Sequence, residues 1–206
     1  MTGIGMICGL LIVLTYEGTR DRIDKLRKEA LEKAIVQVLP GTSHTQVFVW
    51  KDHNFQPSSF NEPSEEMIYA GFNQQNELIG FAIPASGQGY ADLIGILYGY
   101  SLEREAVIGF QVLETKETPG LGDKIQKDPD FLENFEQLDL SVGENGELLH
   151  EVVTVKNGIK QERWQIDGIT GATISSRAIG EILNQSAQKW MPRLNQNQKV
   201  FENGGS

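Results

Sequence analysis

The spacing of hydrophobic and polar residues along the chain predicts helices near both ends and strands in the middle. Residues 1–16 include many apolar side chains and none that is charged. From Arg20 to Leu39 apolar residues recur every three or four positions, which is typical of an amphipathic helix, and Pro40-Gly41 ends it. The same period over residues 175–190 predicts a second helix near the C-terminus.

Short runs rich in β-branched and aromatic residues lie between these helices and predict strands at 47–50, 67–72, 78–83, 90–100 and 106–114. Residues 130–135 predict a short helix, and turn-forming residues at 57–59 and 61–64 predict a surface loop. Asn157-Gly158, between the runs 152–155 and 161–166, is a strong hairpin signal. We therefore expect an α+β fold in which an antiparallel sheet is packed by a C-terminal helix.

The composition of the 206-residue chain is that of an ordinary globular protein, with 39% hydrophobic and 22% charged residues. Its net charge of -10 argues against nucleic-acid binding, which usually requires a basic surface. Cys8 is the only cysteine and the histidines are scattered, so the sequence offers no disulfide, iron–sulfur ligand set or metal site. Redox chemistry would therefore need a bound organic cofactor.

The segment from Asp167 to Thr173 places a hydroxyl at the start of the C-terminal predicted helix. The first turn of a helix has unpaired N–H groups and the positive end of the helix dipole, so it favours a phosphate. Gly171 and Ala172 would let the backbone approach such a ligand closely. Thr173 therefore stands where a phosphate could be bound or covalently attached.

A purely structural interpretation of this segment stays open. Serine and threonine are good helix-capping residues, and the segment contains Thr170, Thr173, Ser175 and Ser176. No lysine follows the glycine, which excludes a phosphate-binding loop of the nucleotide-hydrolase type. The residues alone leave a choice between a helix cap and a phosphate site.

A second candidate segment, residues 114–123, follows the last predicted strand. Pro119 fixes one backbone angle and Gly120 accepts a positive φ, which predicts a tight turn over residues 118–121. Such a turn exposes backbone groups and offers a flat surface to a planar ring. An ordinary strand-to-loop turn is the alternative.

These two segments, in this order and about fifty residues apart, resemble the two signatures of covalent FMN-binding domains. The resemblance implies FMN bound through a phosphoester to Thr173, with no catalytic residue and no metal in the chain. The neighbours that would shape the phosphate end, orient the turn or assist recognition by the attaching enzyme are Asp167, Thr170, Gly171, Ala172 and Ser175. The flavin side would be formed by Glu117, Thr118, Pro119, Gly120, Leu121 and Gly122, with Lys116 or Lys124 facing the electron-rich edge of the ring.

The order of further segments makes the resemblance narrower. Residues 89–100, the turn at Pro119, residues 130–135 and the Thr173 motif follow one another as in G subunits of the Rnf electron-transport complex, over nearly the whole chain. This resemblance implies an electron-relay subunit of a membrane complex that couples electron transfer between ferredoxin and NAD to translocation of sodium ions or protons. Such a complex is an oxidoreductase and translocase, whereas the isolated chain need not be an enzyme.

Three alternatives remain. The C subunit of the sodium-pumping NADH:quinone reductase shares the flavin domain. A stand-alone membrane-anchored flavoprotein reductase would turn over without the other members of a complex. A non-redox anchored module would use the Thr-Gly turn only as a helix cap.

Residues 1–19 are expected to form a single transmembrane anchor, whose apolar run extends through Thr19 or begins before Met1. A buried core helix or a peripheral anchor is the alternative. Basic residues follow from Arg20 on, which by the positive-inside rule favours a cytoplasmic domain. The resemblance implies instead that the flavin domain lies on the extracytoplasmic side of the cytoplasmic (inner) membrane.

The expected organisation is an anchor at 1–19, an amphipathic linker helix at 20–41, an FMN-binding domain at 42–193 and a flexible tail at 194–206. The resemblance implies two kinds of partner. One is the set of other membrane subunits of the complex. The other is a flavin transferase that uses a metal ion and supplies FMN from FAD.

Overall fold

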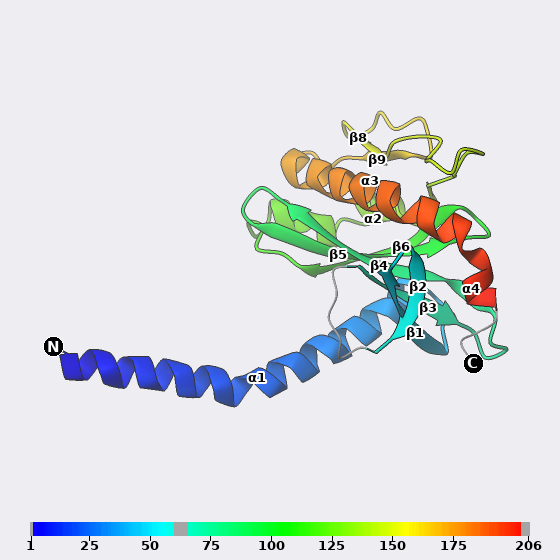
Figure 1. Cartoon of the computed structure of the whole chain (residues 1–206). Helices are drawn as coiled ribbons and strands as arrows, with labels where there is room; N and C mark the ends of the chain where they lie inside the picture. The colour runs from blue at the N-terminus through cyan, green and yellow to red at the C-terminus, as the bar shows by residue number, and fades with distance from the viewer. Residues whose placement is uncertain (1, 60–65, 203–206) are drawn as a thin grey trace. The chain divides into compact units, whose positions relative to one another are not determined.

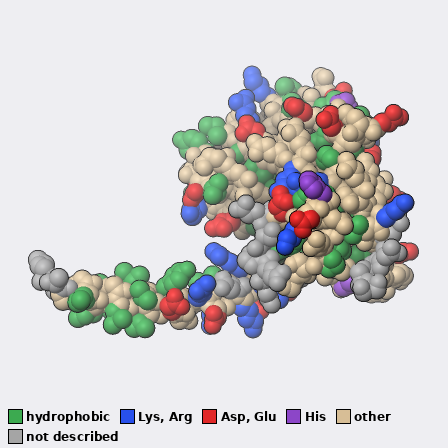
Figure 2. Space-filling view, viewed as in Figure 1, with side chains coloured by type: hydrophobic (Ala, Val, Ile, Leu, Met, Phe, Trp, Pro, Cys, Tyr) green, Lys and Arg blue, Asp and Glu red, His purple; other side chains and the backbone are tan. Residues whose placement is uncertain are grey.

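The computed structural model describes residues 2–59 and 66–202 (Figure 1). The chain divides into two units after Lys33. Helix α1 (Thr2–Val38) accounts for the first unit, and its last residues belong to the second. The apolar side chains of its first half are exposed, Met6 at 77% and Leu10 at 59%, and Figure 2 shows such side chains along the helix.

Within the two described ranges, no helix has both the length and the apolar character needed to cross a membrane. The transmembrane anchor predicted at 1–19 is therefore not confirmed. Helix α1 also runs without a break through the predicted boundary between an anchor and a linker helix.

The second unit, residues 34–206, is built on a seven-stranded antiparallel sheet in the order β2-β1-β3-β4-β5-β6-β7. Its strands are β1 (His44–Lys51), β2 (Asn54–Ser58), β3 (Met67–Phe72), β4 (Leu78–Gln88), β5 (Leu93–Ser101), β6 (Ala106–Glu114) and β7 (Leu138–Asp139). The predicted strands are confirmed as β1 and β3 to β6. Strand β2 lies where a loop was predicted, and its Pro57 is tolerated because β2 is an edge strand. The loop predicted at 61–64 lies outside the described residues.

Helix α3 (Thr173–Gln196) lies between the large sheet and the strands β8 (Val153–Val155) and β9 (Gln165–Asp167) (Figure 1). Its apolar stripe faces the core, because the residues of the predicted helical period are buried: Ile179, Ile182, Leu183, Ala187 and Trp190. The Tyr98 hydroxyl on β5 and Ser186 Oγ on α3 lie 2.9 Å apart, a buried hydrogen bond between the two layers. The short helix predicted at 130–135 appears as α2 (Pro129–Glu133), after the 3₁₀ helix η1 (Gly122–Gln126).

Residues 194–202 differ from the flexible tail that was expected at 194–206. Helix α3 continues to Gln196, and α4 (Gln198–Glu202) follows it. Phe201 on α4 is 1% exposed, and its ring packs edge-on against Phe48 and Phe81. Burial of such a side chain contributes about 2–3 kcal/mol, which is enough to hold this short helix against the sheet.

The hairpin predicted around Asn157-Gly158 is wrong, because β8 and β9 are parallel. The chain does turn here, with Ile159 N–H donating to Lys156 O (3.2 Å) and Gly158 at φ +80°. The segment after the turn does not pair back onto β8, however. Residues 159–164 carry the chain around, so that β9 enters alongside β8 in the same direction. A parallel pair needs such a crossover between its strands, and here residues 156–164 form it.

Candidate functional site

A pocket of about 370 Å³ lies between the segment that follows β6 and the first turn of α3. The segment after β6 contributes Glu117, Thr118, Leu121 and Gly122. The start of α3 contributes Gly171, Ala172, Thr173, Ile174 and Ser175, and Tyr90 from the β4–β5 loop completes the lining. Two motifs that are far apart in the sequence thus line one pocket.

The first turn of α3 is open at this pocket. The helix begins at Thr173, its N-cap residue is Ala172, and no side chain caps it. The helix bonds start with Ser176 N–H, which donates to Ala172 O (2.9 Å). The N–H groups of Thr173, Ile174 and Ser175 therefore have no acceptor within the helix. The helix-cap interpretation of Thr173 is wrong, because it is the first helical residue and is exposed.

Ser176 holds the turn that precedes α3. Its buried hydroxyl accepts from Ile169 N–H (3.1 Å) and donates to Ala172 O (2.9 Å), while Ala172 N–H donates to Ile169 O (3.1 Å). Gly171 has φ +84°, a left-handed conformation that costs other residues about 1–2 kcal/mol. Thr170 and Gly171 form the exposed tip. The turn is therefore fixed from the helix side while its tip stays accessible.

The tight turn predicted over residues 118–121 is confirmed. Leu121 N–H donates to Thr118 O (3.1 Å), and Gly120 has φ +79°, as a type II turn requires. Asp123 closes the turn by accepting from Gly120 N–H (2.7 Å), and its second oxygen accepts from Lys127 Nζ (2.7 Å). The bond from Lys127 is the main reason why the pKa of Asp123 lies below its ordinary value.

A buried carboxylate joins both sides of the pocket. Glu117 is 5% exposed, and its two oxygens accept from the Ser175 hydroxyl (2.5 Å) and from Ala91 N–H (3.0 Å). A Cβ at Gly122 would overlap this carboxylate, so the close approach of η1 depends on the glycine. Since each oxygen already has a protein donor, Glu117 links the turn segment, the β4–β5 loop and α3.

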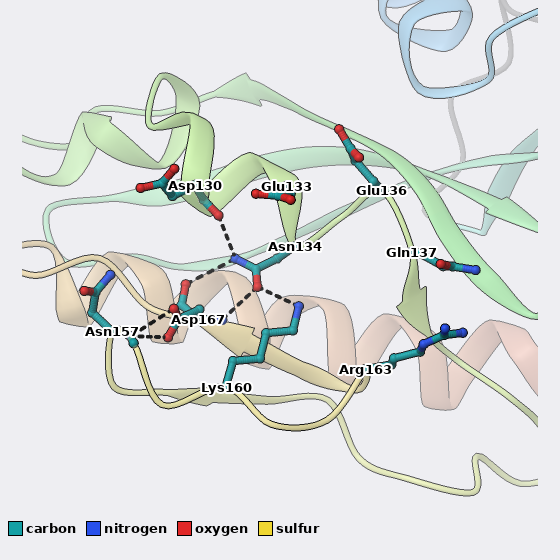
Figure 3. Close-up of a pocket in the computed structure, with 10 residues that line it drawn as sticks. Asp130, Glu133, Asn134, Glu136, Gln137, Asn157, Lys160, Arg163 and Asp167 are labelled. Carbon is teal, nitrogen blue, oxygen red and sulfur yellow. Dashed lines mark hydrogen bonds between the residues drawn. The ribbon is translucent and has the colours of Figure 1, made fainter.

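The other predicted residues of the site are placed differently. Pro119, Gly120 and Thr170 belong to the two turns and do not line the pocket. Asp167 lines a separate cavity, where its carboxylate accepts twice from Gly158 N–H (2.8 and 2.9 Å; Figure 3). The motif is therefore divided between two cavities, with Thr173 on one and Asp167 on the other.

Neither lysine proposed for the flavin edge lines the pocket. Lys116 Nζ donates to Asp92 (2.6 Å) at the surface, and this bond raises the pKa of Lys116 while it lowers that of Asp92. Lys124 is absent from the lining as well. Within the described part of the chain, no cluster of histidine, cysteine or carboxylate side chains could hold a metal ion.

Two residues of the lining were not predicted. Tyr90 and Ile174 are exposed at 65% and 56%, and Leu121 beside them in the lining is exposed at 52%. Ile174 directly follows Thr173, and Tyr90 follows the glycine that opens the β4–β5 loop. The sequence could have indicated both residues, because each is a large hydrophobic residue beside a glycine or a threonine of a motif. Exposed hydrophobic groups gather at binding sites.

The fold and part of the sequence are similar to those of known proteins. Residues 89–188 match the FMN-binding domain family, a range that includes both turns and most of α3. Two solved structures share the fold. One is NqrC from Shewanella oneidensis (TM-score 0.59, 17% identity, 87% of this chain and 97% of that chain). The other is the C subunit of the Na(+)-translocating NADH-quinone reductase from Parabacteroides distasonis (TM-score 0.63, 19% identity, 82% and 94%).

Relatives extend the similarity over the chain. The G subunit of an ion-translocating oxidoreductase complex from Methanosarcina acetivorans is 28% identical over 90% of this chain and 88% of its own length. The G subunit of the Na(+)-translocating ferredoxin:NAD(+) oxidoreductase complex from Acetobacterium woodii is 27% identical over 90% of this chain and 86% of its own. The resemblance seen in the sequence is confirmed as a similarity: residues 89–188 match the FMN-binding domain family, and most of the chain is similar to these G subunits.

Proposed function

We propose that this chain carries FMN as a phosphoester on Thr173 and relays electrons within an ion-translocating oxidoreductase complex. One observation carries the proposal. The hydroxyl of Thr173 is exposed in the uncapped first turn of α3, on a pocket inside the region that matches the FMN-binding domain. The G subunits to which the chain is related supply the kind of complex.

The residues present fit a flavin phosphate. The N–H groups of Thr173, Ile174 and Ser175 have no acceptor within the helix, and the helix dipole favours an anion there. The pocket volume of about 370 Å³ lies within the usual range for small-molecule sites. The exposed hydrophobic side chains of Tyr90, Leu121 and Ile174 line the pocket, and such groups suit a planar aromatic ring.

The attachment step is a transfer of the FMN part of FAD by a separate flavin transferase that uses a metal ion. Thr173 Oγ forms a bond to the phosphorus of the FMN part, the phosphoanhydride bond of FAD breaks, AMP leaves, and the hydroxyl proton is released. Nothing is oxidised or reduced. The exposed tip at Thr170 and Gly171 gives the transferase access, while the bonds of Ser176 hold the turn.

A covalent bond suits the charge of this chain. The net charge of -10 provides no long-range attraction for an anionic cofactor. A tether instead keeps the cofactor at an effective concentration of about millimolar or above. Bound FMN supplies one-electron and two-electron chemistry. The chain's own residues fix its phosphate end and surround its ring, and no residue needs to act as a catalyst.

The electron relay would serve a complex that couples ferredoxin and NAD chemistry to the movement of sodium ions or protons. The other subunits of that complex are the proposed partners. A C-type subunit of a sodium-pumping NADH:quinone reductase is the second candidate, favoured by the shared fold with two such proteins. Purification of the full chain from its native membrane separates these functions from a stand-alone reductase, because a relay co-purifies with multi-span membrane proteins. Turnover with a soluble acceptor by the chain alone would favour the stand-alone reductase.

We further propose that the exposed apolar first half of α1 attaches the chain to the inner membrane, with the flavin domain on the extracytoplasmic side. The exposed side chains of Met6, Leu10 and Leu11 support an apolar contact. Extraction of membranes with alkaline carbonate tests attachment, and recovery of the full chain in the wash would contradict it. Protease accessibility in spheroplasts tests the side.

Intact-mass spectrometry of the full chain produced together with the transferase tests the cofactor and its linkage at once. We expect the added mass of one esterified FMN, and yellow-green fluorescence that persists after denaturation and chromatography. Thr173→Ala should lose both signals. Thr45→Ala is the matched control, because it removes the same side-chain atoms from β1, which contributes no residue to the pocket lining, and it should keep both signals. A colourless wild-type protein of unmodified mass, or flavin retained in Thr173→Ala, would refute the proposal.

A further inference from the structure

A second cavity, of about 660 Å³, lies where α2, the loop after β8 and the end of β9 meet (Figure 3). Asn134, the C-cap residue of α2, lies at its centre and is 4% exposed. Its side-chain nitrogen donates to Phe131 O (2.9 Å) and more weakly to Asp130 O (3.4 Å), two carbonyls at the end of α2. The amide therefore satisfies carbonyls that the end of a helix leaves free.

The same amide also pairs with the backbone of Asp167. Asn134 Oδ1 accepts from Asp167 N–H (2.9 Å), and Asn134 Nδ2 donates to Asp167 O (3.2 Å). The side chain thus acts as a neighbouring strand would, binding the N–H and the C=O of one residue. On the other edge of β9, Gly168 N–H donates to Val155 O of β8 (3.1 Å). The end of β9 is consequently bonded along both edges.

Lys160 fixes the orientation of the amide. Its ammonium donates to Asn134 Oδ1 (2.9 Å), as Figure 3 shows, and an amide nitrogen could not accept that bond. A flipped amide would also turn its oxygen toward Asp167 O and its nitrogen toward Asp167 N–H. Burial lowers the pKa of Lys160, while the charges of Asp167 and Glu133 act in the opposite direction.

This arrangement holds the strand end that leads into the attachment turn. Asp167 is bonded through its backbone to Asn134 and through its carboxylate to Gly158 N–H. Five residues after Asp167 comes Ala172, which Ser176 holds from the helix side. The exposed tip at Thr170 and Gly171 is therefore a short bridge between two fixed ends.

We propose that Asn134 is a positioning residue for flavin attachment: its amide holds Asp167 and thereby presents the turn and Thr173 to the flavin transferase. This inference rests on the proposed attachment of FMN to Thr173. It assigns Asp167 a part in the motif through its backbone and through Gly158, at a distance from the pocket that Thr173 lines. Attachment requires the hydroxyl to reach one geometry, so a loose strand end lowers the fraction of productive encounters.

The test follows the full chain with purified transferase and FAD by intact mass over time. Leucine has a volume similar to that of asparagine but no polar side-chain atoms. We expect Asn134→Leu to take up FMN about tenfold more slowly than the wild type, because a rate change of this size corresponds to the free energy of about one hydrogen bond. Asn134→Asp keeps an acceptor for Lys160 and Asp167 N–H, and we expect a smaller slowing. Hydrogen–deuterium exchange of Gly168 and Ile169 should speed up in the same order.

Tyr98→Phe is the matched control, because it removes a buried hydrogen bond to Ser186 on the other side of α3 from these strands. We expect it to lower stability and to leave the attachment rate unchanged. Equal slowing in Tyr98→Phe and Asn134→Leu at equal stability would overturn the positioning role, as would attachment at the wild-type rate in Asn134→Leu. If Asn134→Leu fails to fold, the same comparison is made with Asn134→Asp. A wild-type chain that takes up no FMN would instead refute the proposed function itself.

Discussion

The two cavities at the ends of the Thr173 motif differ in whether the polar groups that line them have hydrogen-bond partners. At the pocket of Thr173 the hydroxyl is exposed and the first N–H groups of α3 have no acceptor within the helix. At the cavity of Asn134 the amide bonds on both its oxygen and its nitrogen, and the Asp167 carboxylate bonds to Gly158. The difference shows how the motif is built. The polar groups that are left free for a ligand stand next to a segment whose own polar groups are hydrogen-bonded within the protein.

The largest expected change in the free energy of unfolding comes from Asn134→Ala. Removal of the amide leaves Asp167 N–H and Phe131 O without this partner at a site where Asn134 itself is 4% exposed, which should cost about 2–4 kcal/mol. Urea unfolding followed by circular dichroism measures it. A loss below about 0.5 kcal/mol would show that the Asn134 cavity is no more constrained than the Thr173 pocket.

Ser176→Ala should rank next, at about 1–3 kcal/mol. The hydroxyl is fully buried, and without it Ile169 N–H loses its acceptor next to the attachment turn. We expect slower FMN attachment as well, because the helix side of the turn is loosened. Differential scanning calorimetry measures the first effect, and Ser101→Ala, a buried serine on β5, provides a control for the loss of a hydroxyl in general.

Substitutions of two glycines after β6 should distinguish the effect of backbone strain from the effect of displacing the Glu117 side chain. Gly120→Ala places its Cβ in open space, so only the positive φ costs energy, about 1 kcal/mol. Gly122→Ala would push against the Glu117 carboxylate and Ser175 Oγ, and should also reduce FMN attachment. Thermal unfolding and intact mass are compared for the two variants. The proposed link between turn and helix fails if attachment is equal in both.

Thr173→Ala should change stability by less than about 0.5 kcal/mol, because an exposed side chain that caps nothing is removed. The same substitution should abolish covalent FMN completely. Thr173→Ala should therefore lose attachment without losing stability, whereas Asn134→Ala should lose stability, and this contrast tests the comparison of the two cavities most directly. Urea unfolding of the unmodified proteins measures it, and a loss as large as that of Asn134→Ala would break the comparison.

The smallest effect is a pH dependence of the turn at Gly120. The pKa of Asp123 is lowered chiefly by Lys127, so the stabilisation from its charge is present above the ordinary pKa of an aspartate and is lost as pH falls through the lowered value. The Gly120 amide resonance should therefore shift with a midpoint below the ordinary aspartate pKa. Asp123→Asn should remove this titration. A midpoint at or above the ordinary value would contradict the bond pattern.

Regular periods predicted most of the second unit. Strands β1 and β3 to β6, α2 and α3 follow from alternating or helical patterns in consecutive residues. The pattern failed where a distant partner decided the outcome. Phe201 makes α4 part of the core by packing on strands far away in the sequence. Gly158 N–H donates to the carboxylate of Asp167 at the end of β9, in place of the hairpin pairing that the local pattern predicts.

The candidate site shows the same division. Both turns were predicted, because Pro119, Gly120 and Gly171 have backbone preferences of their own. The sequence did not predict the roles of the individual residues within the site. Glu117 could be assigned to the ring from its neighbours in sequence, but the structure bonds both of its oxygens to the protein. Asn134 lies in the segment 130–135, but nothing in the sequence assigned it a role, so only its position beside Asp167 identifies it.

By itself, the sequence determined the two motifs, the hydroxyl at the start of a helix and the family to which they point, because turn chemistry and helical period act between near neighbours. Only the tertiary structure decided that Thr173, Thr118 and Leu121 line one pocket while Asp167 lines another. It also decided which polar groups stay free. That outcome depends on which distant donors and acceptors packing brings within hydrogen-bond distance, and no local pattern specifies them.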